Sequence, residues 1–195
     1  MWTHSQSRAA GLSLLLLFFC KPAEGSELFR LFSTPIAMPE RDPLTGYVLL
    51  TPSNKFTFLP PPGWSVSGNP EEKKVTLSSR DLSASISFTI HPAALFPADD
   101  VQWEVLRQRV RARFPDAKII REFECSGVGQ SGLGFDLDSA LDRHLRVSRR
   151  IEFVPLDGGV IEFDLTVTAK SFADYHFPFE NFIGSFQVER LAAKK

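Results

Sequence analysis

The chain has 195 residues, of which 43% are hydrophobic and 12% aromatic, and this is sufficient for one globular domain with a substantial core. Its 22 lysines and arginines nearly balance its 23 aspartates and glutamates, giving a formal net charge of −1. That balance excludes the strongly basic surface that attracts nucleic acid or an anionic membrane, so a partner has to be recognised locally.

The amino terminus has the pattern of a secretory signal peptide. Arg8 and the free amine give a positive start, residues 9–20 are mostly apolar, and residues 21–24 are more polar. The apolar run is much shorter than the roughly 20 residues that a membrane-spanning helix needs. Ala23 and Gly25 are small residues at the positions that a signal peptidase recognises, which predicts a signal peptide of residues 1–25, cleavage before Ser26 and export.

A second processing route is open at the same place. Cys20 follows an apolar run and resembles the lipidated cysteine of a bacterial lipoprotein, although Phe19 is bulkier than the small residue usual before it. If Cys20 is removed or lipidated, the remaining Cys125 cannot form an internal disulfide, so the fold must be stable without one. Cys125 alternates with Phe123 on a predicted strand, which predicts a small buried apolar side chain.

The first predicted element of the mature chain is an irregular arm over residues 26–54. This segment contains Pro35, Pro39, Pro43 and Gly46 but no sustained hydrophobic period, so we expect it to pack over the domain without regular structure. A single α+β domain is expected over residues 55–190.

The first half of that domain predicts three strands and a helix. Strands are expected at 56–59, around Val75 beyond a turn at 68–70, and at 82–90, where Leu82 begins a strict alternation of apolar and polar residues. A helix is expected from a cap at Asp99 or Asp100 to Phe114, where Pro115 stops it.

The second half predicts four strands, at 118–125, 133–138, 144–154 and 160–168, and a closing aromatic helix from near Ser171 that bends or restarts at Pro178. Placing the apolar residues of the last two strands on one face requires a three-residue loop at 156–158. That register sets Arg150 opposite Asp164, and Glu152 opposite Glu162. The fold class is therefore α+β, with a mostly antiparallel sheet of about six to seven strands packed with two main amphipathic helices.

The segment GVGQSG, residues 127–132, has the glycine spacing of a dinucleotide-binding loop. Such a loop must lead into a helix, whose amino terminus holds the pyrophosphate. Here Leu133, Phe135 and Leu137 alternate with polar or small residues, so the segment enters a strand. We therefore predict a hairpin connection.

Other polar clusters predict no chemistry of their own. Asp136, Asp138, Asp142 and His144 are oxygen-rich, as in Ca²⁺ loops, but the glycine and closing glutamate of an EF-hand are missing, which favours a solvated turn. The hydroxyl groups at 83–89 and the imidazole of His91 share one strand face without a nucleophile turn. No catalytic residue, metal ligand or cofactor is expected.

Three residues are candidate contacts for a ligand or partner: Arg121, Arg149 and His91. Arg121 and Arg149 occur at the alternation phase of an apolar face, where an arginine needs a carboxylate partner or a position on the rim. Two alternatives follow for these arginines. They line a pocket for an anionic ligand, or they cap the edge of the core or mark a bulge.

Two segments carry a resemblance to a known family. Residues 56–64 form an expected strand that runs into P-x-G-W, and residues 179–186 form an expected helix that ends in aliphatic-x-Ser-Phe. Together with the order of the elements, they make residues 54–188 resemble the PsbP/Mog1/DcrB-like superfamily. The resemblance implies an antiparallel sheet sandwiched by helices and, in bacteria, many exported or lipid-anchored members. The family's roles in supporting the oxygen-evolving complex and in binding a small nuclear GTPase depend on features that this sequence does not match, so neither is carried over.

The expected function is that of an exported, non-catalytic accessory, adaptor or binding module of the bacterial cell envelope with a protein partner. Nucleic acid and a membrane-spanning helix are not expected. The alternative is a hydrolase-like envelope enzyme whose site is assembled from distant residues. Tethering through Cys20 would change the placement of the protein more than its activity.

Overall fold

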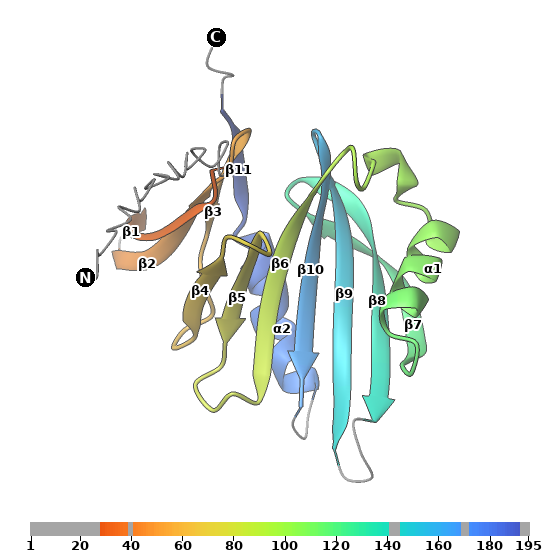
Figure 1. Cartoon of the computed structure of the whole chain (residues 1–195). Coiled ribbons are helices and arrows are strands. Elements are labelled where there is room, and N and C mark those ends of the chain that lie inside the picture. The colour runs from red at the N-terminus through yellow and green to blue at the C-terminus, as the bar shows by residue number, and fades with distance from the viewer. Residues whose placement is uncertain (1–27, 39–40, 141–144, 169–171, 192–195) are drawn as a thin grey trace, which may run out of the picture.

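The computed structural model describes residues 28–38, 41–140, 145–168 and 172–191, which form two antiparallel sheets and two α-helices (Figure 1). The smaller sheet has the strand order β1-β2-β3-β11, namely Arg30–Met38, Arg41–Leu50, Asn54–Phe58 and Gln187–Arg190. The larger sheet has the order β4-β5-β6-β10-β9-β8-β7, namely Ser65–Asn69, Lys74–Ser78, Ala84–Pro92, Gly159–Val167, Arg146–Leu156, Gln130–Ala140 and Lys118–Gly127. The helices are α1, Trp103–Arg113, and α2, Ala173–Gly184. The seven-stranded sheet with two helices confirms the α+β expectation.

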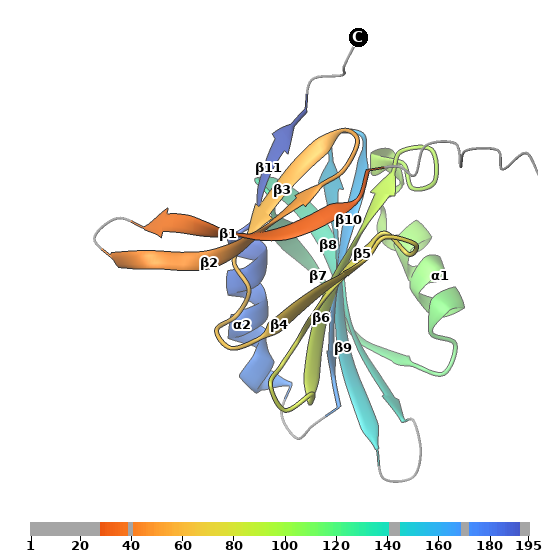
Figure 2. The ribbon, with the colours of Figure 1, turned by 60° about the vertical axis from the view of Figure 1, so that its left-hand side comes forward.

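The two helices lie on opposite faces of the larger sheet (Figure 2). Helix α2 packs between the larger sheet and the smaller one, and this layer forms the main core. Helix α1 buries Leu106 and Val110 against the other face. Both faces of the central strands β9 and β10 are consequently covered, as in the sheet sandwiched by helices that the family resemblance implies.

The main core is rich in aromatic rings. As predicted, Phe179, Phe182 and Phe186 are buried. Phe186 stacks on Phe58 of β3 with ring centroids 5.2 Å apart, and the amide of Leu59 donates a hydrogen bond to Ser185 Oγ at 2.9 Å. The two segments that carry the family resemblance therefore contact each other.

The expectation of an irregular arm at 26–54 is wrong for the described part of that segment. Residues 30–38 and 41–50 form the antiparallel strands β1 and β2, which extend the smaller sheet away from the rest of the molecule (Figure 2). Pro35 lies on the edge strand β1, and Pro43 of β2 lies where the pairing is irregular. The prediction took these prolines as a sign of irregular structure, but an edge strand and an irregular part of a pairing both tolerate proline.

Two short strands were missed. Strand β4 is mostly exposed and polar, and β11 has only four residues, so neither shows an alternating pattern. The turn expected at 68–70 begins later, because Gly68 and Asn69 still belong to β4.

Two boundaries also differ from the prediction. Asp99 and Asp100 lie in a 3₁₀ turn, and the residue that caps α1 is Gln102. Strand β6 begins at Ala84, while Leu82 lies in the preceding turn with φ 59° and an exposure of 76%. The carboxylate of Asp81 accepts hydrogen bonds from the hydroxyl groups of Ser79 and Ser83 and holds this turn.

The predicted register of the β9–β10 hairpin is wrong. The loop has two residues, Asp157 and Gly158, and Arg150 pairs with Leu165 instead of Asp164. Glu152 pairs with Phe163 instead of Glu162. The prediction assumed that all apolar residues of the two strands share one face. In fact Ile151 and Phe153 face α1, while Ile161, Phe163 and Leu165 face α2.

The segment GVGQSG is confirmed as a hairpin connection. Gly127 pairs with Gln130, and the two residues between them, Val128 and Gly129, have φ values of 53° and 72°. Positive φ at both central residues is the pattern of a type I′ turn. The chain then continues as strand β8, so no helix amino terminus is present to bind a pyrophosphate.

Candidate functional site

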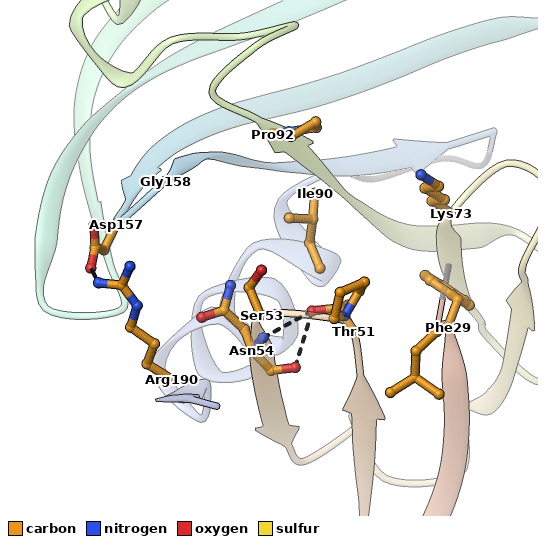
Figure 3. A pocket seen from close by; sticks show the side chains of 12 residues that line it. Phe29, Thr51, Ser53, Asn54, Lys73, Ile90, Pro92, Asp157, Gly158 and Arg190 are labelled. Atoms are coloured by element: carbon orange, nitrogen blue, oxygen red, sulfur yellow. Dashed lines mark hydrogen bonds and ion pairs between the residues drawn. The ribbon is translucent and has the colours of Figure 1, made fainter. Parts of the chain in front are cut away.

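A pocket of about 250 Å³ lies where the ends of the two sheets meet (Figure 3). We call it the inter-sheet pocket. Its wall on the larger sheet comes from the end of β6, and its wall on the smaller sheet comes from the connection between β2 and β3. The residues that line it are Leu28, Phe29, Thr51, Pro52, Ser53, Asn54, Lys73, Ile90, Pro92, Asp157, Gly158 and Arg190.

Local hydrogen bonds fix the β2–β3 connection. Thr51 Oγ1 donates to the carbonyl of Asn54 at 3.0 Å and accepts from the Asn54 amide at 3.2 Å. The carbonyl of Ser53 accepts from the amide of Leu191 at 2.8 Å, which ties this loop to the end of β11. The wall is therefore held in place before any partner binds.

The pocket has an apolar interior and a polar rim. Ile90 points from β6 into the space beside Asn54 and Thr51 (Figure 3). On the rim, Asp157 and Arg190 form an ion pair whose side chains are 74% and 73% exposed. A pair so exposed to water contributes little to stability and can exchange partners at little cost.

A second pocket, of about 230 Å³, lies between α1 and the larger sheet. We call it the α1 pocket. It is lined by His91, Leu95, Phe96, Arg109, Val110, Arg113, Phe114, Ile151, Phe153 and Glu162. His91 faces this pocket, whereas its neighbours Ile90 and Pro92 line the inter-sheet pocket, because successive residues of a strand point to opposite faces.

A buried carboxylate organises the polar side of the α1 pocket. His91 Nε2 lies 3.1 Å from Glu162 Oε2, and Arg113 Nη1 donates to the other oxygen of Glu162. Burial alone would raise the pKa of Glu162, but the contacts with His91 and Arg113 outweigh it and hold the pKa below its ordinary value. Glu162 is therefore a buried anion with two cationic or polar partners.

The same network includes Asp164 and Arg149. Asp164 lies 3.4 Å from Arg149 Nη1 and 3.5 Å from Arg113 Nη2, and burial raises its pKa in spite of these two cations. The Arg149 guanidinium lies 4.2 Å from the centre of the Phe114 ring. Among the candidate contacts, His91 and Arg149 thus belong to one network, joined through Arg113.

Arg121 is not part of this network, because it lies on the α2 side of the sheet. Its Nη2 contacts Asp136 at 2.8 Å, and a register shift between Ile119 and Arg121 breaks the alternation that made the position look apolar. Both arginines therefore have a carboxylate partner, and Arg121 follows a bulge.

Asp136 also holds Arg150, which is only 3% exposed and was not singled out by the sequence. Arg150 Nε lies 2.7 Å from Asp136 Oδ1, and its Nη1 lies 3.2 Å from Glu180 and 2.5 Å from His176 Nδ1 of α2. Burial would lower the pKa of Arg150, but the contact with Asp136 outweighs it and raises the pKa. This arginine fastens α2 to the sheet.

Glu152, two residues along β9 on the same face, is fully buried, and neither of its carboxyl oxygens has a hydrogen-bond partner. Burial, reinforced by the charge of Glu180, raises its pKa to about 8. Cys125 packs against the main core but is half-buried instead of buried as predicted, and burial raises the pKa of its thiol, which disfavours a reactive thiolate.

The acidic cluster considered for Ca²⁺ is only partly described. Asp138 pairs with Arg146, as the solvated-turn interpretation expects, while Asp142 and His144 lie outside the described residues. Within the described ranges, no group of three or more histidine, cysteine, aspartate or glutamate side chains is placed to hold a metal ion.

Sequence reasoning found His91 and Arg149 but missed Arg109, Arg113 and Phe96. One signal was available: Arg109 and Arg113 are four residues apart on a predicted helix and must share a face. Phe96 lies in an irregular loop, so no periodicity could place it. Among the described helices, none is long and apolar enough to cross a membrane.

Comparisons with known proteins concern the fold. No protein-family model matches the chain, and no match was found among curated proteins. Similar solved structures include cyanobacterial PsbP from Synechocystis sp. PCC 6803, with 16% identity over 89% of this chain and 99% of that one and a TM-score of 0.45. They also include a Mog1 variant, with 11% identity over 66% and 80% of the two chains and a TM-score of 0.43. A third is LpqN of Mycobacterium tuberculosis, described as involved in cell envelope biogenesis, with 14% identity over 83% and 92% and a TM-score of 0.33. PsbP and Mog1 are two of the three groups in the name of the superfamily that the sequence resembles.

Proposed function

We propose that this protein is an exported, non-catalytic binding module of the bacterial cell envelope and that it binds a protein partner through the inter-sheet pocket. The observation that supports this function is the pocket itself, with its apolar interior, its fixed loop and its exposed charged rim. Protein interfaces commonly have this arrangement, in which an apolar centre is surrounded by a polar rim.

The size of the pocket suits one anchoring side chain. Its volume of about 250 Å³ lies below the roughly 300–1,000 Å³ of pockets that hold drug-sized molecules. A few large side chains inserted into pockets provide most of the binding energy of protein interfaces. We therefore infer that the partner inserts an apolar or aromatic residue beside Ile90 and makes polar contacts with Asn54 and Arg190.

A substitution that fills the pocket tests this proposal. Ser53 lines the pocket and is exposed, so Ser53→Trp should occupy the space without disturbing the core. Ser126→Trp is the matched control, because Ser126 is an exposed serine of edge strand β7 outside the pocket.

The partner is first identified with a photo-crosslinking residue at position 53 in intact cells, and its affinity for the purified variants is then measured. Binding should weaken at least tenfold in Ser53→Trp and stay unchanged in Ser126→Trp. A partner that binds Ser53→Trp as tightly as the unmodified protein would overturn the proposed site.

Export is proposed from the amino-terminal sequence. Residues 1–25 are the signal peptide, the mature chain begins at Ser26, and residues 55–190 are the main domain. Mass spectrometry of the mature protein should find Ser26 at its amino terminus. A diacylglyceryl group on Cys20 would instead establish the lipid-anchored form, and an unprocessed chain would contradict export through a cleaved signal.

A hydrolase-like enzyme is the second candidate, because His91 and Glu162 form an imidazole–carboxylate pair in the α1 pocket. The lining of that pocket includes no serine, threonine or cysteine, so such an enzyme would have to activate water. Arg113 also holds Glu162, and this favours binding over catalysis because it keeps the carboxylate a weak base. Ester or amide hydrolysis that is lost in His91→Gln would establish the enzyme.

A further inference from the structure

The α1 pocket has a floor of aromatic rings. Phe96 and Phe153 are 4% and 3% exposed and stack with centroids 5.6 Å apart. The His91 ring lies 5.1 Å from the Phe96 ring, at an interplanar angle of 30°. Arg109 covers the Phe96 ring and Phe153 stacks on it, so a flat apolar or aromatic group would meet the edges of these rings.

The rim of the pocket is cationic. Arg109 and Arg113 are one helical turn apart on α1, and the Arg109 guanidinium lies 4.1 Å from the centre of the Phe96 ring. Their side chains are 37% and 44% exposed, whereas those of Glu162 and Asp164 are 8% and 7% exposed. An incoming molecule therefore meets the guanidinium groups before it meets the carboxylates.

Arg109 is the guanidinium best placed to accept a new partner. It forms an ion pair with Asp100, at 3.3 Å through Nη2, and the Asp100 side chain is 42% exposed. An exposed pair of this kind contributes little, so a ligand can displace it. A guanidinium has five N–H donors in a planar fork, and this fork matches the two oxygens of a carboxylate.

We propose that the α1 pocket binds a small aromatic carboxylate, whose ring lies in the pocket beside Phe96 and His91 and whose carboxylate is held by Arg109. The volume of about 230 Å³ limits the ligand to one or two rings. This site is separate from the inter-sheet pocket, so the inference does not depend on the function proposed above.

The test uses 2-naphthoate as the probe and 2-naphthamide as its uncharged counterpart, with the whole protein and isothermal titration calorimetry. Arg109→Gln removes the proposed carboxylate contact. Arg111→Gln makes the same change of charge on the same helix, at an exposed residue that does not line the pocket. The Arg109 side chain is 37% exposed on the rim and Arg111 is exposed, so both variants should fold, which circular dichroism checks.

Saturable binding of 2-naphthoate is expected, weakened roughly tenfold or more in Arg109→Gln and less than twofold in Arg111→Gln. The amide should bind at least tenfold more weakly than the carboxylate. In NMR spectra of the unmodified protein, the ring signals of Phe96 should shift as 2-naphthoate is added. The proposal is overturned by an absence of saturable binding, by equal effects of the two arginine substitutions, or by equal binding of the amide.

Discussion

Glu152 is a buried residue whose ionisation affects stability. The folded state keeps its proton up to a pKa of about 8, whereas an exposed glutamate loses it near 4.5. Between these two values the unfolded chain releases a proton that the folded chain retains. The contribution of protonated Glu152 to the free energy of unfolding is therefore fully present below about pH 4.5. It is lost as the pH rises through 8, and the total loss is on the order of 4 kcal/mol.

The variant Glu152→Gln should remove this dependence. The free energy of unfolding is measured with urea at pH 5 and at pH 8.5 for both proteins. The decrease between these two pH values should be several kcal/mol smaller in Glu152→Gln than in the unmodified protein. Glu124→Gln, a change at an exposed glutamate of β7, serves as the control and should leave the pH dependence unaltered. Equal pH dependence in the unmodified protein and in Glu152→Gln would show that this carboxyl ionises normally.

Leu82 is a residue whose backbone conformation conflicts with its side chain. Its φ is 59°, a left-handed conformation that costs about 1–2 kcal/mol. Because the residue is 76% exposed, burial of its side chain does little to offset this strain. Leu82→Gly should therefore raise the free energy of unfolding by about 0.5–1 kcal/mol in urea titrations. Leu95→Gly, at a similarly exposed leucine outside the left-handed region, should lower it. A loss of stability in both variants would remove the strain argument.

Helix α2 illustrates how one element joins the layers of the molecule. Phe182 is 1% exposed and contacts the rings of Phe58, Phe88 and Phe163 at centroid distances of 5.7, 6.2 and 6.1 Å. Phe182→Ala should reduce the free energy of unfolding by about 3–5 kcal/mol, because it leaves a cavity between the two sheets. Phe177→Ala, on the same helix at a side chain that is 73% exposed, should change it by less than about 0.5 kcal/mol. Chemical denaturation of the two variants measures the contrast, and similar losses would place Phe177 in the core as well.

At the level of elements, the sequence predicts those whose pattern has one buried face. The alternation from Ala84 to Ile90 and the helical spacing of Phe179 and Phe182 identify β6 and α2 correctly, although α2 ends at Gly184, before Phe186. The same reasoning predicts the wrong register for the β9–β10 hairpin, because both of its faces are buried and polar residues such as Arg150 and Glu152 lie inside. Periodicity cannot set a register where neither face is solvated.

At the level of the whole molecule, the smaller sheet is unevenly anchored. Val48 and Leu49 of β2 are buried, whereas Phe32 and Leu44 in the β1–β2 hairpin are each 46% exposed. Segments with few buried contacts open with little free energy. Amide hydrogen exchange should therefore be fast at Ser33, Ile36 and Leu44 and slow at Leu49 and in β10. Uniformly slow exchange along the hairpin would mean that its outer half is packed against something in solution.

The pockets could be predicted only in part, because each is built from distant parts of the chain. His91 and Arg149 stand out in the sequence as polar groups at structured positions, but Glu162, Arg113 and Asp164 connect them only after the sheet has formed. The inter-sheet pocket depends on β1, β2 and β11, the strands that the sequence does not reveal. Sites of this kind follow from topology more than from local pattern.

The end of β6 serves both cavities, with Ile90 and Pro92 facing one and His91 facing the other. A molecule that displaces this strand end by entering one cavity must alter the free energy of occupying the other. Thermodynamic linkage makes the effect mutual, so a partner that strengthens or weakens uptake of an aromatic acid would have its own affinity changed by the same factor. Residues 90–92 would then couple the binding of a protein partner in the inter-sheet pocket to the binding of an aromatic carboxylate in the α1 pocket.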